Sequence, residues 1–251
     1  MIKAHPSPIW KKILGVYFEI KVRNAFFKTY IKGLENTGFL KNNRDIPVIF
    51  YCSHTSWWDA AIAIVLSLRI FTMDAYGMMV ETQLSKYRFF TKIGMFSVNR
   101  KNTREALQSL SYAASLLINT NRALWIFPQG KIEHPEKRPI DFENGLSIIL
   151  KKIGKAYVIP VAMRFEFLKE EHAEAFISIG TAHLFNGNED NIREISNDLS
   201  KKLMNEIEEL RTTVIEGKIE QFYILFKGRK SVEKRWSAFK NRLTNKKENS
   251  F

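Results

Sequence analysis

The chain has 251 residues, of which 45% are hydrophobic, so it is long enough for one sizeable globular domain or for a domain with an appendage. Its single cysteine, Cys52, excludes an intramolecular disulfide and a cysteine-based metal site, and its five histidines are too scattered to bind a metal ion. The formal net charge of +13 points to an anionic partner.

On charge alone, that partner is open between nucleic acid, anionic lipid head groups and an acidic carrier protein. The 19 Phe, 8 Tyr and 5 Trp residues favour a membrane surface, where aromatic and basic side chains act together. The longest apolar stretch, at 60–73, contains Arg69 and is too short to span a bilayer, and the N-terminus lacks the pattern of a signal peptide. We therefore expect a peripheral protein at the cytoplasmic face of a membrane with anionic lipids, and no nucleic-acid partner.

The N-terminal segment, residues 1–40, is predicted to be a basic amphipathic helical segment. Apolar side chains recur at helical spacing from Ile9 to Phe18 and continue less regularly to Ile31. Residues 1–33 hold seven basic side chains and one acidic side chain. A basic helix with Trp and Phe on its other face is typical of an interfacial membrane anchor. A surface helix that packs on the domain and exposes its basic face fits the same pattern.

Residues 41–217 are predicted to form an α/β domain. Apolar runs predict strands at 46–53, 94–100, 123–127, 157–163 and 175–182, and the stretch 71–80 fits a strand or a loop. Helical spacing predicts helices at 59–70, from Asn102 to Ile118, and at 191–210. Strands that alternate with helices of this length indicate a mixed, partly parallel sheet flanked by helices.

Residues 218–251 are predicted to form a basic tail or helix. This segment holds ten basic residues and three glutamates, interleaved with aromatic residues that include Phe222, Trp236 and Phe239. Such a segment suits a membrane or an acidic partner, and a solvated tail helix is the alternative. We expect its last eight residues to be disordered.

The junction between the strand at 46–53 and the helix at 59–70 carries His54 and Asp59. A histidine with a nearby carboxylate can act as a general base whose imidazole the carboxylate orients. A histidine beside an apolar strand is more often a core residue, so this pair alone is weak support for catalysis.

Three further segments have features of an anion-binding site or an irregular strand. Asn99 and Arg100 end the strand at 94–100, where they could clamp an anion. The sequence Phe-Pro-Gln-Gly-Lys at 127–131 breaks a strand into a turn, which frees backbone N–H groups for an anion and places a cation beside them. Pro160 lies in the buried run at 157–163 and cannot donate to a strand ladder, so it predicts an edge strand or a bulge.

In this order and spacing, these segments resemble the glycerolipid acyltransferase family, which acylates lysophosphatidate. The hallmarks of that family are a His-x4-Asp block, a Gly-x-x-Phe-x-x-Arg-like block, a Phe-Pro-Glu-Gly-Thr-Arg block and a Val-x-Pro-Val block. The likeness runs from about Val48 to Val161, and the sequence at 141–145 also looks like the Phe-Lys-x-Gly element of the family.

The resemblance implies transfer of a fatty acyl group from acyl-CoA or acyl carrier protein to the hydroxyl of a lysophospholipid-type acceptor, without a metal or a resident cofactor. His54 would be the general base and Asp59 would orient it. The residues implied in binding the acceptor and its phosphate are Asn99, Arg100, Gln129, Gly130 and Lys131.

Two departures from the family pattern leave alternatives open. Gln129-Gly130-Lys131-Ile132 stands where the family has Glu-Gly-Thr-Arg, and Phe96 comes one position early in the second block. Another acceptor, such as an aminolipid or a lipid glycoside, therefore remains possible. A non-catalytic basic protein that binds membranes or lipids is the alternative from another class. The sequence lacks the Gly-x-Ser-x-Gly motif of serine hydrolases.

Overall fold

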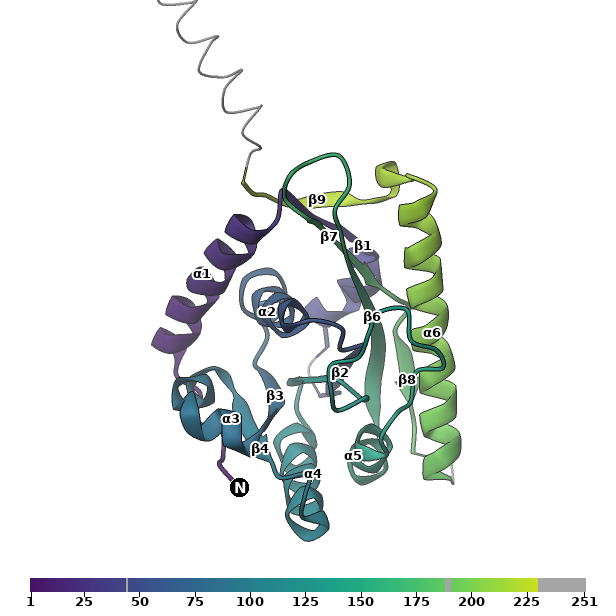
Figure 1. Cartoon of the computed structure of the whole chain (residues 1–251). Helices are drawn as coiled ribbons and strands as arrows, with labels where there is room; N and C mark the ends of the chain where they lie inside the picture. The colour runs from purple at the N-terminus through teal and green to yellow at the C-terminus, as the bar shows by residue number, and fades with distance from the viewer. Residues whose placement is uncertain (44, 188–190, 230–251) are drawn as a thin grey trace, which may run out of the picture.

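The computed structural model describes residues 1–43, 45–187 and 191–229 (Figure 1). Its strands are β1 (Lys28–Lys32), β2 (Val48–Cys52), β3 (Ala75–Val80), β4 (Met95–Val98), β5 (Ala123–Ile126), β6 (Ala156–Glu166), β7 (Glu174–Ile179), β8 (His183–Phe185) and β9 (Tyr223–Lys227). Its α-helices are α1 (Pro8–Ala25), α2 (Trp57–Val65), α3 (Glu81–Lys86), α4 (Thr103–Leu117), α5 (Gly145–Ile153) and α6 (Ile192–Ile215). Shorter helical turns are η1 (Leu34–Lys41), η2 (Leu66–Ile70), η3 (Arg88–Ile93) and η4 (Ile219–Gln221).

In the described residues, the strands form one nine-stranded sheet in the order β4-β3-β5-β2-β6-β7-β1-β9, with β8 paired to β6. The strands from β4 to β6 in this order are parallel, and so are β7 and β1. The pairs β6–β7, β6–β8 and β1–β9 are antiparallel. The predicted α/β class, with a mixed and partly parallel sheet flanked by helices, is confirmed.

Helices cover both faces of this sheet, which explains the continuous apolar run of β2. Phe50 and Cys52 belong to the core cluster that α1 and α2 complete, whereas Ile49 and Tyr51 belong to the cluster with α4, α5 and α6. Side chains alternate between the faces of a strand, so a strand with helices on both sides is apolar throughout. Figure 1 shows α1 and α6 on opposite sides of the sheet.

The N-terminal segment departs from the prediction after residue 25. The helix was expected to continue to Ile31, but α1 ends at Ala25 and residues 28–32 form β1. Strand β1 pairs with β7 and with β9, so strands from all three predicted segments belong to one sheet. Thr29, Tyr30 and Ile31 favour extended structure, and these two partners satisfy their backbone groups. Residues 230–251, which include Trp236 and Phe239 of the predicted tail, lie outside the described residues.

Pro160 does not mark an edge strand, contrary to one of its two predicted settings. It lies in β6, which has β2 on one side and both β7 and β8 on the other. Residues 156–158 pair with β8 and residues 161–166 pair with β7, so Pro160 falls where β6 changes its antiparallel partner. The missing N–H therefore interrupts neither antiparallel ladder, and the Pro160 carbonyl accepts from Gly180 N at 2.9 Å.

None of the helices in the described part of the chain is both long enough and apolar enough to cross a membrane.

Candidate active site

His54 lies in the loop between the carboxyl end of β2 and α2, and Asp59 lies in the first turn of α2. His54 Nδ1 is 3.2 Å from Asp59 Oδ2, and the Asp59 side chain is fully buried. A carboxylate at this position favours the tautomer with the proton on Nδ1. The arrangement leaves Nε2 of His54 as the basic nitrogen for a substrate.

The Asp59 carboxylate also caps the N-terminus of helix α2. Asp59 Oδ2 accepts hydrogen bonds from the backbone N–H groups of Thr55 at 2.6 Å and Ser56 at 2.7 Å. Ser56 is the N-cap, and its Oγ accepts from the N–H of Trp58 at 3.1 Å. A carboxylate is stabilised by the free N–H groups and the dipole at a helix N-terminus. The spacing of His54 and Asp59 is thus fixed by a capping box.

The loop that follows β5 holds His54 in three ways. The backbone N–H of His54 donates to Gln129 Oε1 at 2.7 Å, and its carbonyl accepts from Glu133 N at 2.9 Å. The imidazole stacks on Phe127, with ring centroids 4.4 Å apart. Because β2 and β5 are parallel neighbours, the loops after them emerge side by side at the carboxyl edge of the sheet.

Gln129 holds the backbone of His54 and does not line the open chamber that is described below. Its side chain is buried, and its Nε2 donates to Glu133 Oε2 at 2.9 Å. Hydrogen bonds from Lys137 and from Gln129 lower the pKa of Glu133 to about 2, so this carboxylate is ionised at neutral pH. The Gln129 amide therefore has protein partners on both of its polar atoms, and its predicted role in binding the acceptor stays a prediction.

Arg100 reaches from the end of β4 to the same loop. Its Nη1 donates to the carbonyl of Gly130, and its Nη2 donates to the carboxylate of Glu143. Gly130 has a φ of +65°, and a Cβ at this position would lie 2.8 Å from Arg100 Cζ. The backbone conformation favours glycine here, and a Cβ would displace the guanidinium of Arg100.

Glu143 is the site residue that the sequence analysis missed. The available signal was a glutamate directly after Phe142, at the place where the Phe-Lys-x-Gly element has a lysine.

The remaining two predicted residues differ in their surroundings. Asn99 Nδ2 donates to Glu105 Oε2 at 3.1 Å, and its Oδ1 accepts from Lys101 N, so Asn99 shapes the turn before α4. The structure does not place it at the wall of the open chamber described next. Lys131 is exposed and lies at that wall, with its Nζ 3.2 Å from Glu133 Oε1.

An open chamber lies in front of His54. Of the predicted residues, His54, Arg100, Gly130 and Lys131 line this chamber, and Glu143 lines it beside them. The structure thus brings together four of the seven predicted site residues, while Asp59 and Gln129 support them from behind.

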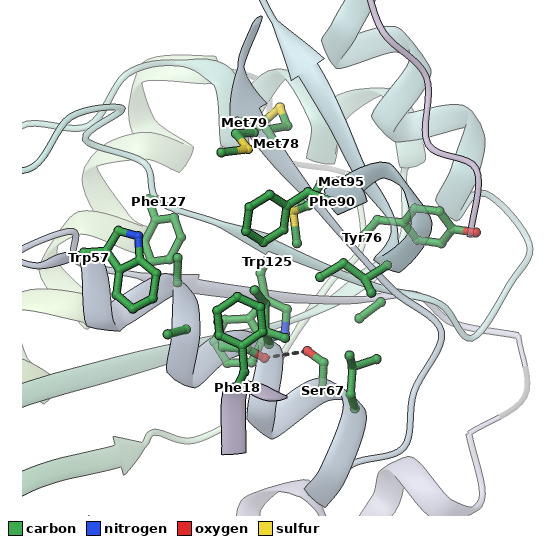
Figure 2. Close-up of a pocket in the computed structure, with 18 residues that line it drawn as sticks. Phe18, Trp57, Ser67, Tyr76, Met78, Met79, Phe90, Met95, Trp125 and Phe127 are labelled. Carbon is green, nitrogen blue, oxygen red and sulfur yellow. Dashed lines mark hydrogen bonds between the residues drawn. The ribbon is translucent and has the colours of Figure 1, made fainter. Parts of the chain in front are cut away.

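An apolar pocket adjoins the chamber and extends into the fold (Figure 2). The chamber and the pocket share Trp57, Ala60, Met78, Met79 and Phe127 in their walls. The large side chains deeper in the pocket are Phe18, Tyr76, Phe90, Met95 and Trp125 (Figure 2). Residues of α1, α2, η2, β3, η3, β4 and β5 line the pocket. His54, which stacks on Phe127, stands where the polar chamber meets the apolar pocket.

Comparisons with known proteins place the chain near acyltransferases in three ways. Residues 31–164 match the family model named Acyltransferase. Over 128 residues the chain is 30% identical to acl-2 of Caenorhabditis elegans, which is named as a 1-acyl-sn-glycerol-3-phosphate acyltransferase. That match covers 49% of this chain and 43% of the relative, so the chain spans less than half of the curated relative it matches. The crystal structure of the 1-acyl-sn-glycerophosphate (LPA) acyltransferase PlsC from Thermotoga maritima is similar, with a TM-score of 0.59. This structural match covers 80% of the present chain and 79% of the PlsC chain at 15% sequence identity, which shows a shared fold.

Proposed function

The chain belongs to the acyltransferase family, and we propose that it transfers a fatty acyl group from an acyl thioester to the hydroxyl of a lysophospholipid-type acceptor. The observation that carries this proposal is the position of His54. Its Nδ1 faces the Asp59 carboxylate at 3.2 Å, and its ring stands between a polar chamber and an apolar pocket. An acceptor hydroxyl in the chamber and an acyl chain in the pocket would meet at this residue.

The proposed reaction is a direct transfer. His54 Nε2 takes the proton of the acceptor hydroxyl while the oxygen attacks the thioester carbonyl carbon. The tetrahedral intermediate collapses, the C–S bond breaks, and the imidazolium returns the proton to the leaving thiolate. The buried Asp59 carboxylate stabilises the imidazolium between these steps.

Cys52 is close in sequence but is unsuited to form an acyl-enzyme. It is fully buried, and its Sγ donates to the carbonyl of Ser53. Burial, together with the charge of Asp59, raises the pKa of its thiol well above the ordinary value, which keeps it protonated.

The donor is proposed to be acyl-CoA or acyl carrier protein. Its acyl chain would lie in the apolar pocket, where Met78, Met79 and Met95 present flexible side chains to a lipid (Figure 2). The methionines at 78 and 79 could be read as core residues from the sequence, and the structure places both at the wall between pocket and chamber. The strongly basic chain suits an acidic carrier protein as well as CoA.

The outer face of α1 suits contact with the surface of an anionic membrane. Its exposed apolar residues are Ile9, Trp10, Ile13, Val16, Tyr17 and Ile20. The exposed Lys12 and Lys21 accompany them. Phe18 was predicted to share the membrane face but is buried in the domain, where it lines the apolar pocket. Helix α1 is therefore apolar on two sides, one packed on the domain and one free for lipid.

The test is an acyl-transfer assay with the purified full chain, labelled acyl-CoA or acyl carrier protein, and a panel of lysolipids. His54→Ala is compared with His5→Ala, which removes an exposed histidine far from Asp59 in the sequence. Loss of transfer in His54→Ala, with transfer retained in His5→Ala, supports the proposal. Transfer that survives in His54→Ala contradicts the base assignment, and binding without transfer by the wild type favours a non-catalytic lipid-binding protein.

A further inference from the structure

The polar chamber has two opposite charges within hydrogen-bonding contact of each other. The guanidinium of Arg100 donates to the carboxylate of Glu143, and both side chains are partly exposed to the chamber. The backbone N–H of Glu143 donates to the carbonyl of Pro128 at 2.8 Å. Glu143 is therefore held to the loop after β5 by its backbone and to Arg100 by its side chain.

The other cation at the chamber wall is also close to an acidic group. Lys131 Nζ is 3.2 Å from Glu133 Oε1, and Glu133 is ionised and also pairs with Lys137. Among the described residues, the lysine, arginine and acidic side chains that line the chamber are Arg100, Lys131 and Glu143. These three side chains sum to a charge of only +1, and the Arg100–Glu143 pair is electrically balanced, although the whole chain has a formal charge of +13.

This balance affects which head group can bind beside Arg100. Any group that reaches the guanidinium also lies within a few ångströms of the Glu143 carboxylate, because the two side chains are hydrogen-bonded. A phosphomonoester carries about 1.5 to 2 negative charges at neutral pH and would be repelled by this carboxylate. A hydroxyl or an ammonium group would instead donate a hydrogen bond to it.

We propose that the acceptor has a head group without net negative charge that donates hydrogen bonds to Glu143, and that Glu143 selects against a phosphomonoester. This inference rests on the acyl transfer proposed above and specifies its acceptor. Glu143 acts as a specificity residue: it meets the head group, while the acylated hydroxyl is positioned at His54.

The experiment compares three acceptors with the same acyl chain in micelles of a neutral detergent, which removes the influence of membrane charge. The acceptors are lysophosphatidate, lysophosphatidylethanolamine and a neutral lyso-galactosyl glycerolipid. The proteins are the full-length wild type, Glu143→Gln, and Glu216→Gln as a control on an exposed glutamate after α6. Glutamine at position 143 keeps an acceptor for Arg100 and removes the negative charge, and the Tm of each variant verifies folding.

We expect the wild type to use at least one of the two acceptors without net charge with a kcat/KM at least about tenfold above that for lysophosphatidate. Tenfold corresponds to about 1.4 kcal/mol. Glu143→Gln should raise kcat/KM for lysophosphatidate about tenfold, and Glu216→Gln should leave all three values unchanged. A loss with Glu143→Gln that is confined to lysophosphatidylethanolamine identifies an ammonium donor, and a loss with the galactolipid identifies hydroxyl donors.

A wild type that prefers lysophosphatidate, with a preference that Glu143→Gln leaves unchanged, overturns this inference and leaves the proposed acyl transfer standing. A wild type that acylates none of the three acceptors, with either acyl donor, overturns the proposed acyl transfer and this inference with it.

Discussion

The side chain of Gln129 connects the candidate base His54 to Glu133. Its Oε1 accepts from the His54 N–H at 2.7 Å, and its Nε2 donates to Glu133 Oε2 at 2.9 Å. A glutamate, which the related motif has at this position, could accept from His54 but could not donate to Glu133. Because position 133 is a glutamate, position 129 needs a side chain that both accepts and donates a hydrogen bond, and glutamine does so.

Gln129→Glu should impair the protein although it restores the family residue. It would bring two carboxylates to about hydrogen-bonding distance, which raises the pKa of one of them or drives them apart and releases His54. We expect kcat to fall at least about tenfold and the free energy of unfolding to fall by about 1–3 kcal/mol, as measured by acyl transfer and by denaturant unfolding. Adding Glu133→Gln exchanges donor and acceptor and should recover most of the loss. A double variant as impaired as Gln129→Glu alone would contradict this explanation.

His54 and Asp59 should differ in what their removal costs. His54→Ala should lower kcat by about 10²- to 10⁴-fold with little change in Tm, because the ring is a proton acceptor at the wall of the chamber. Asp59→Ala should lower kcat as well, and it should also lower the free energy of unfolding by about 1–3 kcal/mol, since the N–H groups of Thr55 and Ser56 lose their acceptor. Equal stability of the two variants in urea would contradict the dual role of Asp59.

Filling the apolar pocket should restrict the length of the acyl donor. Ala63 lies in α2 at the pocket wall and is almost fully buried, so Ala63→Leu projects three more carbon atoms toward the pocket. Each methylene excluded from the pocket costs about 0.8 kcal/mol, so two cost about tenfold in kcat/KM. The loss should appear with long-chain donors and be absent with short-chain donors, which serve as the internal control. An equal loss at every chain length would assign the pocket no role in holding the acyl chain.

The outward face of α1 should decide membrane binding. Ile13→Asp places a charge in the middle of the exposed apolar stripe, and we expect it to weaken binding to vesicles with anionic lipid at least about tenfold in a sedimentation assay. Leu107→Asp is the matched control, because Leu107 is a similarly exposed apolar residue on helix α4. Binding that both variants weaken equally, or that neither changes, would leave α1 without a specific role at the membrane.

A side chain at position 130 should destabilise the protein and disturb Arg100. Gly130→Ala forces a non-glycine residue to a φ of +65° and brings a Cβ against the Arg100 guanidinium. We expect a loss of about 1–2 kcal/mol in the free energy of unfolding and a lower kcat/KM. Gly38→Ala is the control, because a Cβ at that position meets no atom within 4 Å, and it should be close to neutral. Crystals of Gly130→Ala with Arg100 undisplaced would contradict the packing argument.

The pairing of His54 with Asp59 and most of the helices and strands could be predicted from the sequence because they depend on neighbours in the chain. The capping box that joins Ser56 to Asp59 spans three residues, and the Asn102 side chain caps α4 by accepting from the backbone N–H of Glu105, also three residues on. The continuous apolar run of β2 reflects burial on both faces of the sheet, because every residue of such a strand is then buried and apolar. The sequence thereby determined the class of fold and identified the His54–Asp59 pair as the candidate base and its orienting carboxylate.

Only the tertiary structure decided which residues form the chamber wall and which support it. The partners of Gln129 and Arg100 lie in loops that follow different strands, and parallel strands bring such loops together across many residues of sequence. The strand β1 depends on β7 and β9, which are far along the chain, so local spacing favoured a helix there. The balance between Arg100 and Glu143 likewise exists only after the loops behind β4 and β5 have met. Net charge and hydrophobic periodicity can be read directly from the sequence, whereas a binding site depends on contacts between residues that are far apart in it.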